Sequence, residues 1–228
     1  MDILQKRNAI GVLALVAITG AAQAGVASAL ILDDFDSDPN DDAGGPGVYS
    51  TVIFNNPFNQ GSEFSLDTTL NSGSDVGALI FNSGIGVEQG ASIVYDNAGA
   101  GLSLNPGAMG LTGFELDFLS VDQGFTMSIE LGNNGDGPSG LAGIATLEMF
   151  VPAGIGQTAS FSWGDFIYSP NFDPADVDSI TLSFNPEDGA TASLDFIASE
   201  FRGVIVPTPG AVAIMGIGGL LIVSRRRA

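Results

Sequence analysis

Short segments that alternate apolar and polar residues constrain the fold of this chain more than any other feature. Clear examples are Phe114–Phe118, Phe125–Leu131, Ser179–Phe184 and Ala192–Ile197. Alternation with a period of two gives a strand one buried face and one face in water. Because 32 glycines and 11 prolines supply turn residues along the chain, the pattern predicts an antiparallel sandwich or barrel.

The rest of the middle of the chain supports the same fold class. Further strands are predicted at Tyr49–Phe54, Ala78–Phe81, Ala91–Tyr95, Ala145–Val151 and Thr158–Trp163. The only helical signal is short: Asp173–Asp178 is predicted to form one turn, with Asp173 as its cap and Pro174 at its first position. We therefore expect an all-β fold consisting of a single antiparallel β-sandwich.

The charges are distributed very unevenly along the sequence. Arg202 is the only basic residue between Asn8 and Ser224, whereas all acidic residues except Asp2 lie in that interval. Twenty-five acids against one arginine give this part a net charge near −24. Such a surface repels nucleic acids and anionic lipids. Self-association is expected to need salt or divalent cations that screen the repulsion.

The middle of the chain has enough apolar residues to form a core. Hydrophobic residues make up 45% of the whole sequence, so a disordered acidic chain is not expected. The predicted domain spans residues 30–202, and this length suffices for one core. The chain has no cysteine, so the core must hold without disulfides.

The N-terminal residues have the three parts of a secretory signal peptide. Lys6 and Arg7 precede an almost wholly apolar stretch from Ala9 to Ala22, and small-residue cleavage patterns end at Ala24 and at Ala29. We predict a signal peptide helix in residues 1–24. Cleavage after Ala29 stays open as the alternative.

The C-terminal residues 203–228 predict a membrane segment. Two prolines, Pro207 and Pro209, precede an apolar helix expected at residues 211–223. Arg225, Arg226 and Arg227 follow it, as expected for a transmembrane helix that ends in the cytoplasm. Thirteen residues would span only about 20 Å as a helix, so a core helix is the alternative. Three consecutive arginines favour the membrane.

This tail resembles the PEP-CTERM sorting signal of Gram-negative and related bacteria. In that signal a Pro-Glu-Pro motif precedes a hydrophobic helix and a basic cluster. Here Pro207, Thr208, Pro209 and Gly210 occupy the motif, with Thr208 in the Glu position. The resemblance implies a membrane transpeptidase of the exosortase type as a partner. It also implies that the protein comes from a bacterium that makes extracellular polysaccharide.

Two short segments resemble the first and last strands of galactose-binding-like jelly rolls. They are Ile31–Asp36 and Ser193–Ile197. This second resemblance implies a jelly-roll-like sandwich in which the two ends of the domain lie together.

Composition limits the chemistry that the domain can perform. The chain has no His and no Cys, and Lys6 is its only lysine. A Ser-His-Asp triad and a histidine-based zinc site are therefore excluded. Paired carboxylates of the glycosidase type remain, but no spacing or basic partner marks one pair. We expect no enzyme activity.

Calcium is the one cofactor that the sequence suggests. Asp34, Asp36, Asp38 and Asp42 offer hard oxygen ligands along one acidic run. The run is not an EF-hand, because Pro39 stands where that loop needs glycine. A calcium site and a solvated acidic linker both stay open. A second acidic set, Asp173, Asp176 and Asp178, is expected to form a cap and turn.

Aromatic residues suggest one further kind of site. Trp163 and Tyr168 lie in the segment Phe161–Tyr168, which is predicted as a strand with a bulge near Gly164. These rings could form a platform for a sugar, or they could belong to the core.

Together these features predict an exported cell-surface or extracellular-matrix protein. It would pass through the export machinery, be held at the inner membrane during sorting and then reach the cell surface. The main hypothesis is a structural or adhesive role in an envelope or exopolysaccharide matrix. A calcium-assisted carbohydrate-binding module is the first alternative, and a carboxylate glycosidase the second.

Overall fold

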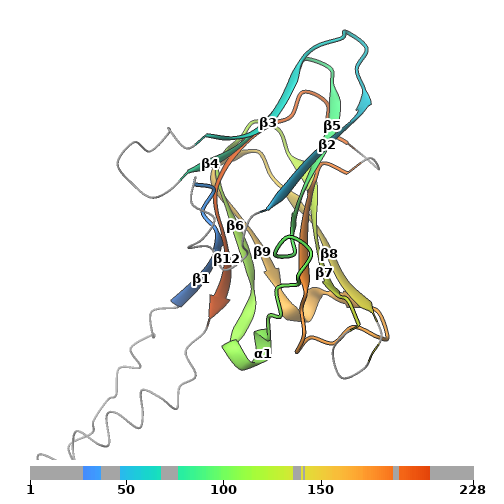
Figure 1. The fold of residues 1–228 in the computed structure, drawn as a ribbon. Coiled ribbons are helices and arrows are strands. Elements are labelled where there is room, and N and C mark those ends of the chain that lie inside the picture. Colours follow the sequence, from blue (N-terminus) through green and yellow to red (C-terminus); the bar gives the residue numbers. More distant parts are fainter. Residues whose placement is uncertain are drawn as a thin grey trace, which may run out of the picture.

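The protein folds into two antiparallel β-sheets packed face to face (Figure 1). The computed structural model describes residues 28–36, 47–67, 77–135, 140, 142–186 and 190–205. The predicted all-β sandwich is confirmed. Both predicted flanking helices, in residues 1–24 and 211–223, lie outside the described residues. Among the residues described, no helix has the length and apolar character needed to cross a bilayer.

Within the part of the chain that the structure describes, each sheet contains six strands. In the first sheet the order is β3 (Ser62–Asp67), β4 (Ala78–Ser83), β12 (Asp195–Ile205), β6 (Leu111–Val121) and β9 (Gly154–Ser162), and β1 (Ser28–Asp33) also pairs with β12. In the second sheet the order is β10 (Ile167–Tyr168), β8 (Gly143–Val151), β7 (Phe125–Asn133), β11 (Ser179–Phe184), β5 (Glu88–Tyr95) and β2 (Val48–Asn55).

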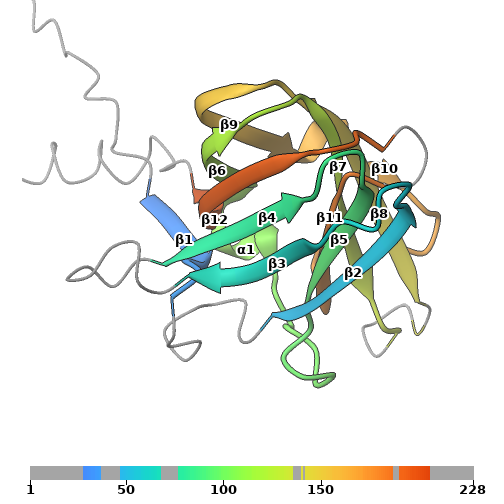
Figure 2. The same cartoon turned by 90° about the horizontal axis from the view of Figure 1, so that it is seen from above.

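The last strand, β12, organises the first sheet. It pairs with β6 along one side, and with β4 and then β1 along the other. Ser28 lies opposite Ile205, so the first and last strands are neighbours. Figure 2 shows β1 beside β12 from above. The expectation that the two ends of the domain lie together is confirmed.

Phenylalanine rings from both sheets meet between them. Phe196 of β12 is almost fully buried and stacks on Phe81 and Phe125, with ring centroids 5.0 Å and 5.2 Å away. Phe118 meets it edge-on at 5.4 Å, and Phe184 lies 5.2 Å away. Burial of such large rings is the main source of stability in a sandwich without disulfides.

Most predicted strands are present, but the segment Phe161–Tyr168 is not one bulged strand. The chain leaves the first sheet after Ser162 and forms a single 3-10 turn, η1 (Trp163–Asp165). It then enters the second sheet as β10. Packing of the Trp163 ring against Phe114 and Phe166, with centroids 5.5 Å away from each, accounts for this crossing.

Three local differences have identifiable causes. The strand predicted from Ala192 begins only at Asp195, because Ser193 adopts a positive φ and its Oγ accepts the Gly86 N–H at 2.6 Å. Asp173 caps a turn rather than a helix, and its Oδ1 accepts the Ala175 N–H at 2.9 Å. Strand β3 was not predicted, although Phe64 and Leu66 alternate there with polar residues.

Removing the central ring should weaken the whole sandwich. Because Phe196→Ala deletes contacts to both sheets, we expect the free energy of unfolding to fall by about 3–5 kcal/mol. Phe150→Ala is the matched control, since that ring is 64% exposed, and it should change stability by less than about 0.5 kcal/mol. Urea unfolding followed by tryptophan fluorescence measures both. Equal effects of the two substitutions would contradict the central role of Phe196.

Candidate functional site

Two loops and a short helix close one end of the sandwich. Helix α1 (Pro106–Met109) begins where the Asn105 Oδ1 accepts the Ala108 N–H at 2.9 Å. It ends at Gly110, whose φ of 72° suits a residue without a side chain. An isolated bridge between Leu104 and Val177 ties this region to the loop before β11. The two loops are thereby held next to each other.

A pocket of about 310 Å³ lies between these loops and the η1 turn. We call it the aromatic pocket. Two aromatic rings and two prolines contribute to its walls, and no charged residue lines it. The lining residues are Asn105, Pro106, Gly107, Leu111, Trp163, Tyr168, Pro174 and Ala175. The pocket thus brings together the two aromatic residues that the sequence analysis singled out.

A continuous series of rings connects the pocket to the core. Phe114 packs between Phe201 and Trp163, and Trp163 stacks on Phe166. Tyr168 follows, 6.3 Å from Phe166. Trp163 is half-buried while Tyr168 remains 45% exposed. The same series of rings therefore begins in the core, at Phe114, and ends at the surface, at Tyr168.

The polar atoms of the two rings have different surroundings. The Tyr168 hydroxyl donates to the Trp163 carbonyl oxygen at 2.5 Å. Burial raises the pKa of the Tyr168 phenol, so the ring stays neutral. In contrast, the indole Nε1 of Trp163 is buried and has no acceptor among the described residues. An unpaired buried donor costs about 1–3 kcal/mol.

A second, acidic groove lies at the ends of the second sheet. It encloses about 600 Å³ and is lined by carboxylates that include Asp96, Glu130 and Asp178. Asp178 is buried, and its Oδ2 accepts the Asn134 N–H at 2.8 Å. The Asp96 carbonyl oxygen accepts the N–H groups of Gly99 and Gly101. The Asp178 carboxylate thus holds the end of β7 beside the loop before β11, and the Asp173 side chain caps the turn in that loop.

The first part of the predicted acidic run packs into the sandwich. Asp34 is buried, and its Oδ1 accepts the Asp36 N–H at 3.2 Å. Asp38 and Asp42 lie outside the described residues. Within the residues that the structure describes, no group of three or more acidic side chains is arranged to hold a metal ion. Calcium binding by these four aspartates therefore stays a prediction.

Asp33, at the start of the same run, has a structural role. Its carboxylate accepts the hydroxyls of Tyr95 at 2.8 Å and Tyr49 at 3.2 Å, and the Phe35 N–H at 2.7 Å. Burial raises the pKa of the Asp33 carboxyl despite these hydrogen bonds, and the charge of Asp34 raises it further. The carboxylate joins β1 to two strands of the opposite sheet.

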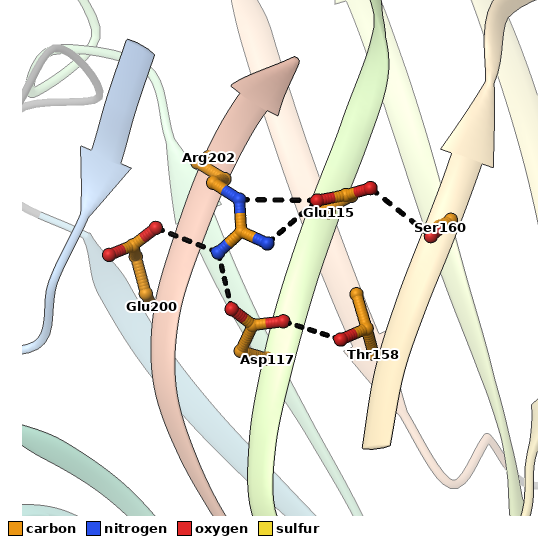
Figure 3. Close-up of polar contacts among 6 residues, drawn as sticks. All are labelled: Glu115, Asp117, Thr158, Ser160, Glu200 and Arg202. Carbon is orange, nitrogen blue, oxygen red and sulfur yellow. Dashed lines mark hydrogen bonds and ion pairs between the residues drawn. The ribbon is translucent and has the colours of Figure 1, made fainter. Parts of the chain in front are cut away.

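Arg202 is held by three carboxylates on the outer face of the first sheet (Figure 3). Its guanidinium contacts Glu115 at 2.7 Å, Glu200 at 2.8 Å and also Asp117. Burial alone would raise the pKa of Asp117, but hydrogen bonds from Arg202 and Thr158 hold it below the ordinary value. The hydrogen bond that Arg202 donates to Asp117 also raises the pKa of the guanidinium, which stays charged. This cluster links β12, β6 and β9, and it engages the one basic side chain among the residues that the structure describes.

One further carboxylate pair lies in a groove of about 570 Å³ on the first sheet. The Asp195 N–H donates to the Asp122 Oδ1 at 2.7 Å. Burial raises the pKa of the Asp195 carboxyl, and the nearby charge of Asp122 raises it further. The sequence analysis did not single out this pair, because the two residues are distant in the sequence.

Several predicted site residues cannot be placed. The sorting motif, Pro207 to Gly210, and the three arginines, Arg225 to Arg227, lie outside the described residues. The sequence analysis also missed the proline walls of the aromatic pocket. Asn105 before Pro106 is a cap followed by proline at the first helical position, and this local signal could have located α1.

Comparison with known proteins gives similarity in architecture alone. Neither a protein-family model nor a curated protein matches the sequence. Among solved structures, a family 11 carbohydrate-binding module from Clostridium thermocellum, in complex with a β-1,3-1,4-mixed-linked tetrasaccharide, has a TM-score of 0.48 and 14% identity. The match covers 79% of this chain and 97% of the module.

Two other solved structures give the same result. A family 30 carbohydrate-binding module of a cellulosomal cellulase of Clostridium thermocellum has a TM-score of 0.48 and 13% identity, with 79% and 99% of the two chains covered. An exo-β-agarase has a TM-score of 0.47 and 13% identity, with 79% of this chain and 25% of the agarase covered. Similarity at this level extends no further than the general β-sandwich architecture.

Loss of Arg202 should destabilise the protein more at neutral pH than in acid. In the wild type, the pKa of Asp117 is lower in the folded state than the ordinary aspartate pKa of about 3.9. Asp117 therefore stabilises the fold fully above about pH 3.9. This stabilisation is lost as the pH falls through the pKa of the folded state. In Arg202→Met three carboxylates face each other without a cation. We expect a loss of roughly 1–3 kcal/mol at pH 7 that shrinks on acidification, as those acids take up protons.

Urea unfolding at several pH values between 3 and 7 measures this difference. Gln157→Met is a control on the neighbouring strand β9, and its effect should not change with pH. A constant difference between wild type and Arg202→Met across the pH range would show that the cluster contributes no electrostatic stabilisation.

Proposed function

We propose that this protein binds carbohydrate at the cell surface and that the aromatic pocket holds a neutral sugar ring. The observation that carries the proposal is the meeting of Trp163, Tyr168, Pro106 and Pro174 around one cavity without a charged lining residue. A pyranose ring has an apolar C–H face that packs on aromatic and proline rings, while its hydroxyls accept and donate hydrogen bonds. Ligand pockets commonly combine apolar walls with a few polar groups in this way.

The charge of the protein limits the ligand further. A domain with a net charge near −24 repels anionic polymers, and the guanidinium of Arg202, its only described basic group, is held by three carboxylates. A neutral polysaccharide carries no such penalty. The Asn105 side chain adds a polar amide to the pocket lining, so a hydroxyl-rich neutral ligand fits it best.

The sequences at the two ends of the chain support a location of this binding site outside the cell. The signal peptide and the PEP-CTERM-like tail support export followed by anchoring at the inner membrane and transfer to the surface by an enzyme of the exosortase type. Strand β1 begins at Ser28, so cleavage after Ala24 leaves that strand whole, whereas cleavage after Ala29 removes two of its residues. A structural or adhesive role in a polysaccharide matrix then follows from binding at the pocket.

Calcium enters this proposal as an assisting ion. Asp34, Asp36, Asp38 and Asp42 would order the segment that follows β1 by binding it. The role is limited to the fold, because the aromatic pocket has no carboxylate in its lining. A chelator is therefore expected to affect stability more than sugar binding.

Sugar binding should depend on the exposed ring of the aromatic pocket. Tyr168→Ala removes the stacking surface, and we expect the affinity for a neutral polysaccharide to fall by about tenfold or more, equivalent to about 1.4 kcal/mol. Tyr168→Phe keeps the ring and should stay within about threefold of wild type. Phe150→Ala removes a ring of similar exposure elsewhere and should have no effect.

Affinity electrophoresis of the full chain in mild detergent, through gels containing mixed-linkage glucan, xylan or agarose, measures these differences with and without a chelator. If a polysaccharide retards the Tyr168→Ala variant as much as the wild type, the sugar-binding site lies outside the aromatic pocket. Absence of retardation by every neutral polysaccharide would argue for a passive structural role.

Processing at the tail can be tested separately. If an exosortase acts, the intact mass of the protein recovered from the surface of its host should lack the signal peptide and end near Pro207 to Gly210. Replacing Arg225 to Arg227 with glutamines should keep the longer, uncut form in the cell. A surface form that retains these arginines would mean that the tail is a plain membrane anchor.

A further inference from the structure

Strand β2 leaves a long uncharged edge open to pairing. It lies at the end of the second sheet and pairs only with β5 among the described strands. Figure 2 draws β2 at the outer margin of the sheet. From Gly47 to Gln60 the sequence contains no charged residue. Half of the backbone groups of an edge strand point away from the sheet, and proteins usually protect such edges with charges, prolines or bulges.

The side chains of β2 are also unusually apolar for their exposure. Val48, Val52 and Ile53 are each at least half exposed. Between Val48 and Ile53 the strand pairs with β5 without a bulge and contains neither glycine nor proline. A strand that is regular, β-branched and free of charge matches the properties of an edge that adds another strand.

Three other edges, those of β3, β10 and β9, are less suited to pairing. Strand β3 carries Glu63 and Asp67, and β10 has only two residues. Strand β9 is uncharged, but it begins with glycines at positive φ and runs beside Glu115 and Asp117 of β6. The strand beside β2 carries one acid, Glu88, which lies opposite Asn55 at the end of β2 and not beside Val48–Ile53. In a protein with a net charge near −24, this stretch is where two copies repel each other least.

We propose that β2 is a self-association surface, at which two copies of this protein join their second sheets through antiparallel β2–β2 pairing. A two-fold axis at Ser50 brings Val48 of one copy opposite Val52 of the other on the same face. It also extends an existing row of directly paired serines across the interface: Ser128, Ser183, Ser92 and Ser50. Ser50 and Ser92 already share a hydrogen bond of 2.7 Å.

The contact is small, so the dimer is weak and depends on concentration and salt. One strand pair buries less surface than the 1,200–2,000 Å² typical of stable interfaces. The remaining acids repel over a Debye length of about 8 Å at physiological salt. If the proteins are tethered to one surface, as the proposed function implies, their high local concentration favours the contact.

The absence of cysteine makes a direct test possible. Ser50→Cys places one thiol on the proposed axis, where paired strands bring the two Cα atoms within disulfide range. Ile155→Cys places a thiol on the competing edge β9, at a site that is 86% exposed. We expect mild oxidation of the full chain in 0.5 M salt to cross-link Ser50→Cys at least fivefold more than Ile155→Cys.

A charge on the edge should abolish the contact. Adding Val52→Glu to Ser50→Cys should reduce cross-linking to the level of Ile155→Cys, while adding Ile155→Glu should leave it unchanged. Circular dichroism establishes that each variant is folded. Equal cross-linking of the two cysteine variants, or no effect of Val52→Glu, would overturn the proposal. Adding Tyr168→Ala should not change cross-linking. The test of β2 pairing therefore does not depend on whether the aromatic pocket binds sugar.

Discussion

The structure depends on the position of β12 between its neighbours. This strand pairs with β6 on one side and with β4 and β1 on the other, so it joins the beginning, middle and end of the described chain. Its inner face supplies Phe196 to the aromatic core, and its outer face supplies Arg202 to the carboxylate cluster. Since the chain has no cysteine, the first sheet is held together by non-covalent contacts, and β12 makes three of its strand pairings.

Scarcity of positive charge determines much of the remaining arrangement. The one basic residue of the described chain is neutralised by three acids, and other carboxylates accept backbone N–H groups in loops or tyrosine hydroxyls in the core. Each of these contacts lowers the cost of placing an anion near other anions. Uncharged surfaces are then the places where a second copy meets least repulsion and where a neutral ligand desolvates no charge. The aromatic pocket and the stretch Val48–Ile53 of β2 are both of this kind.

Local patterns predicted the strands well, because alternation depends on neighbours within a few residues. They failed where distant contacts decide the backbone. The chain turns after Ser162 because Trp163 packs on Phe114 and Phe166, and β12 starts late because Ser193 bonds the distant Gly86. Likewise, Trp163 and Tyr168 could be named as a candidate pair, but the prolines that complete their pocket come from loops about 70 residues apart in the sequence.

The sequence by itself determined the fold class, the excess of acids, the lack of histidine and cysteine chemistry, and the likeness of its ends to export and sorting signals. These properties depend on composition, periodicity and short motifs, which are visible along the chain. Only the tertiary structure decided which strands lie at the sheet edges, where Arg202 finds its three carboxylates and which residues enclose the aromatic pocket. Strand order and loop contacts join residues far apart in the sequence, and the energy that selects among them comes from packing that no local pattern encodes.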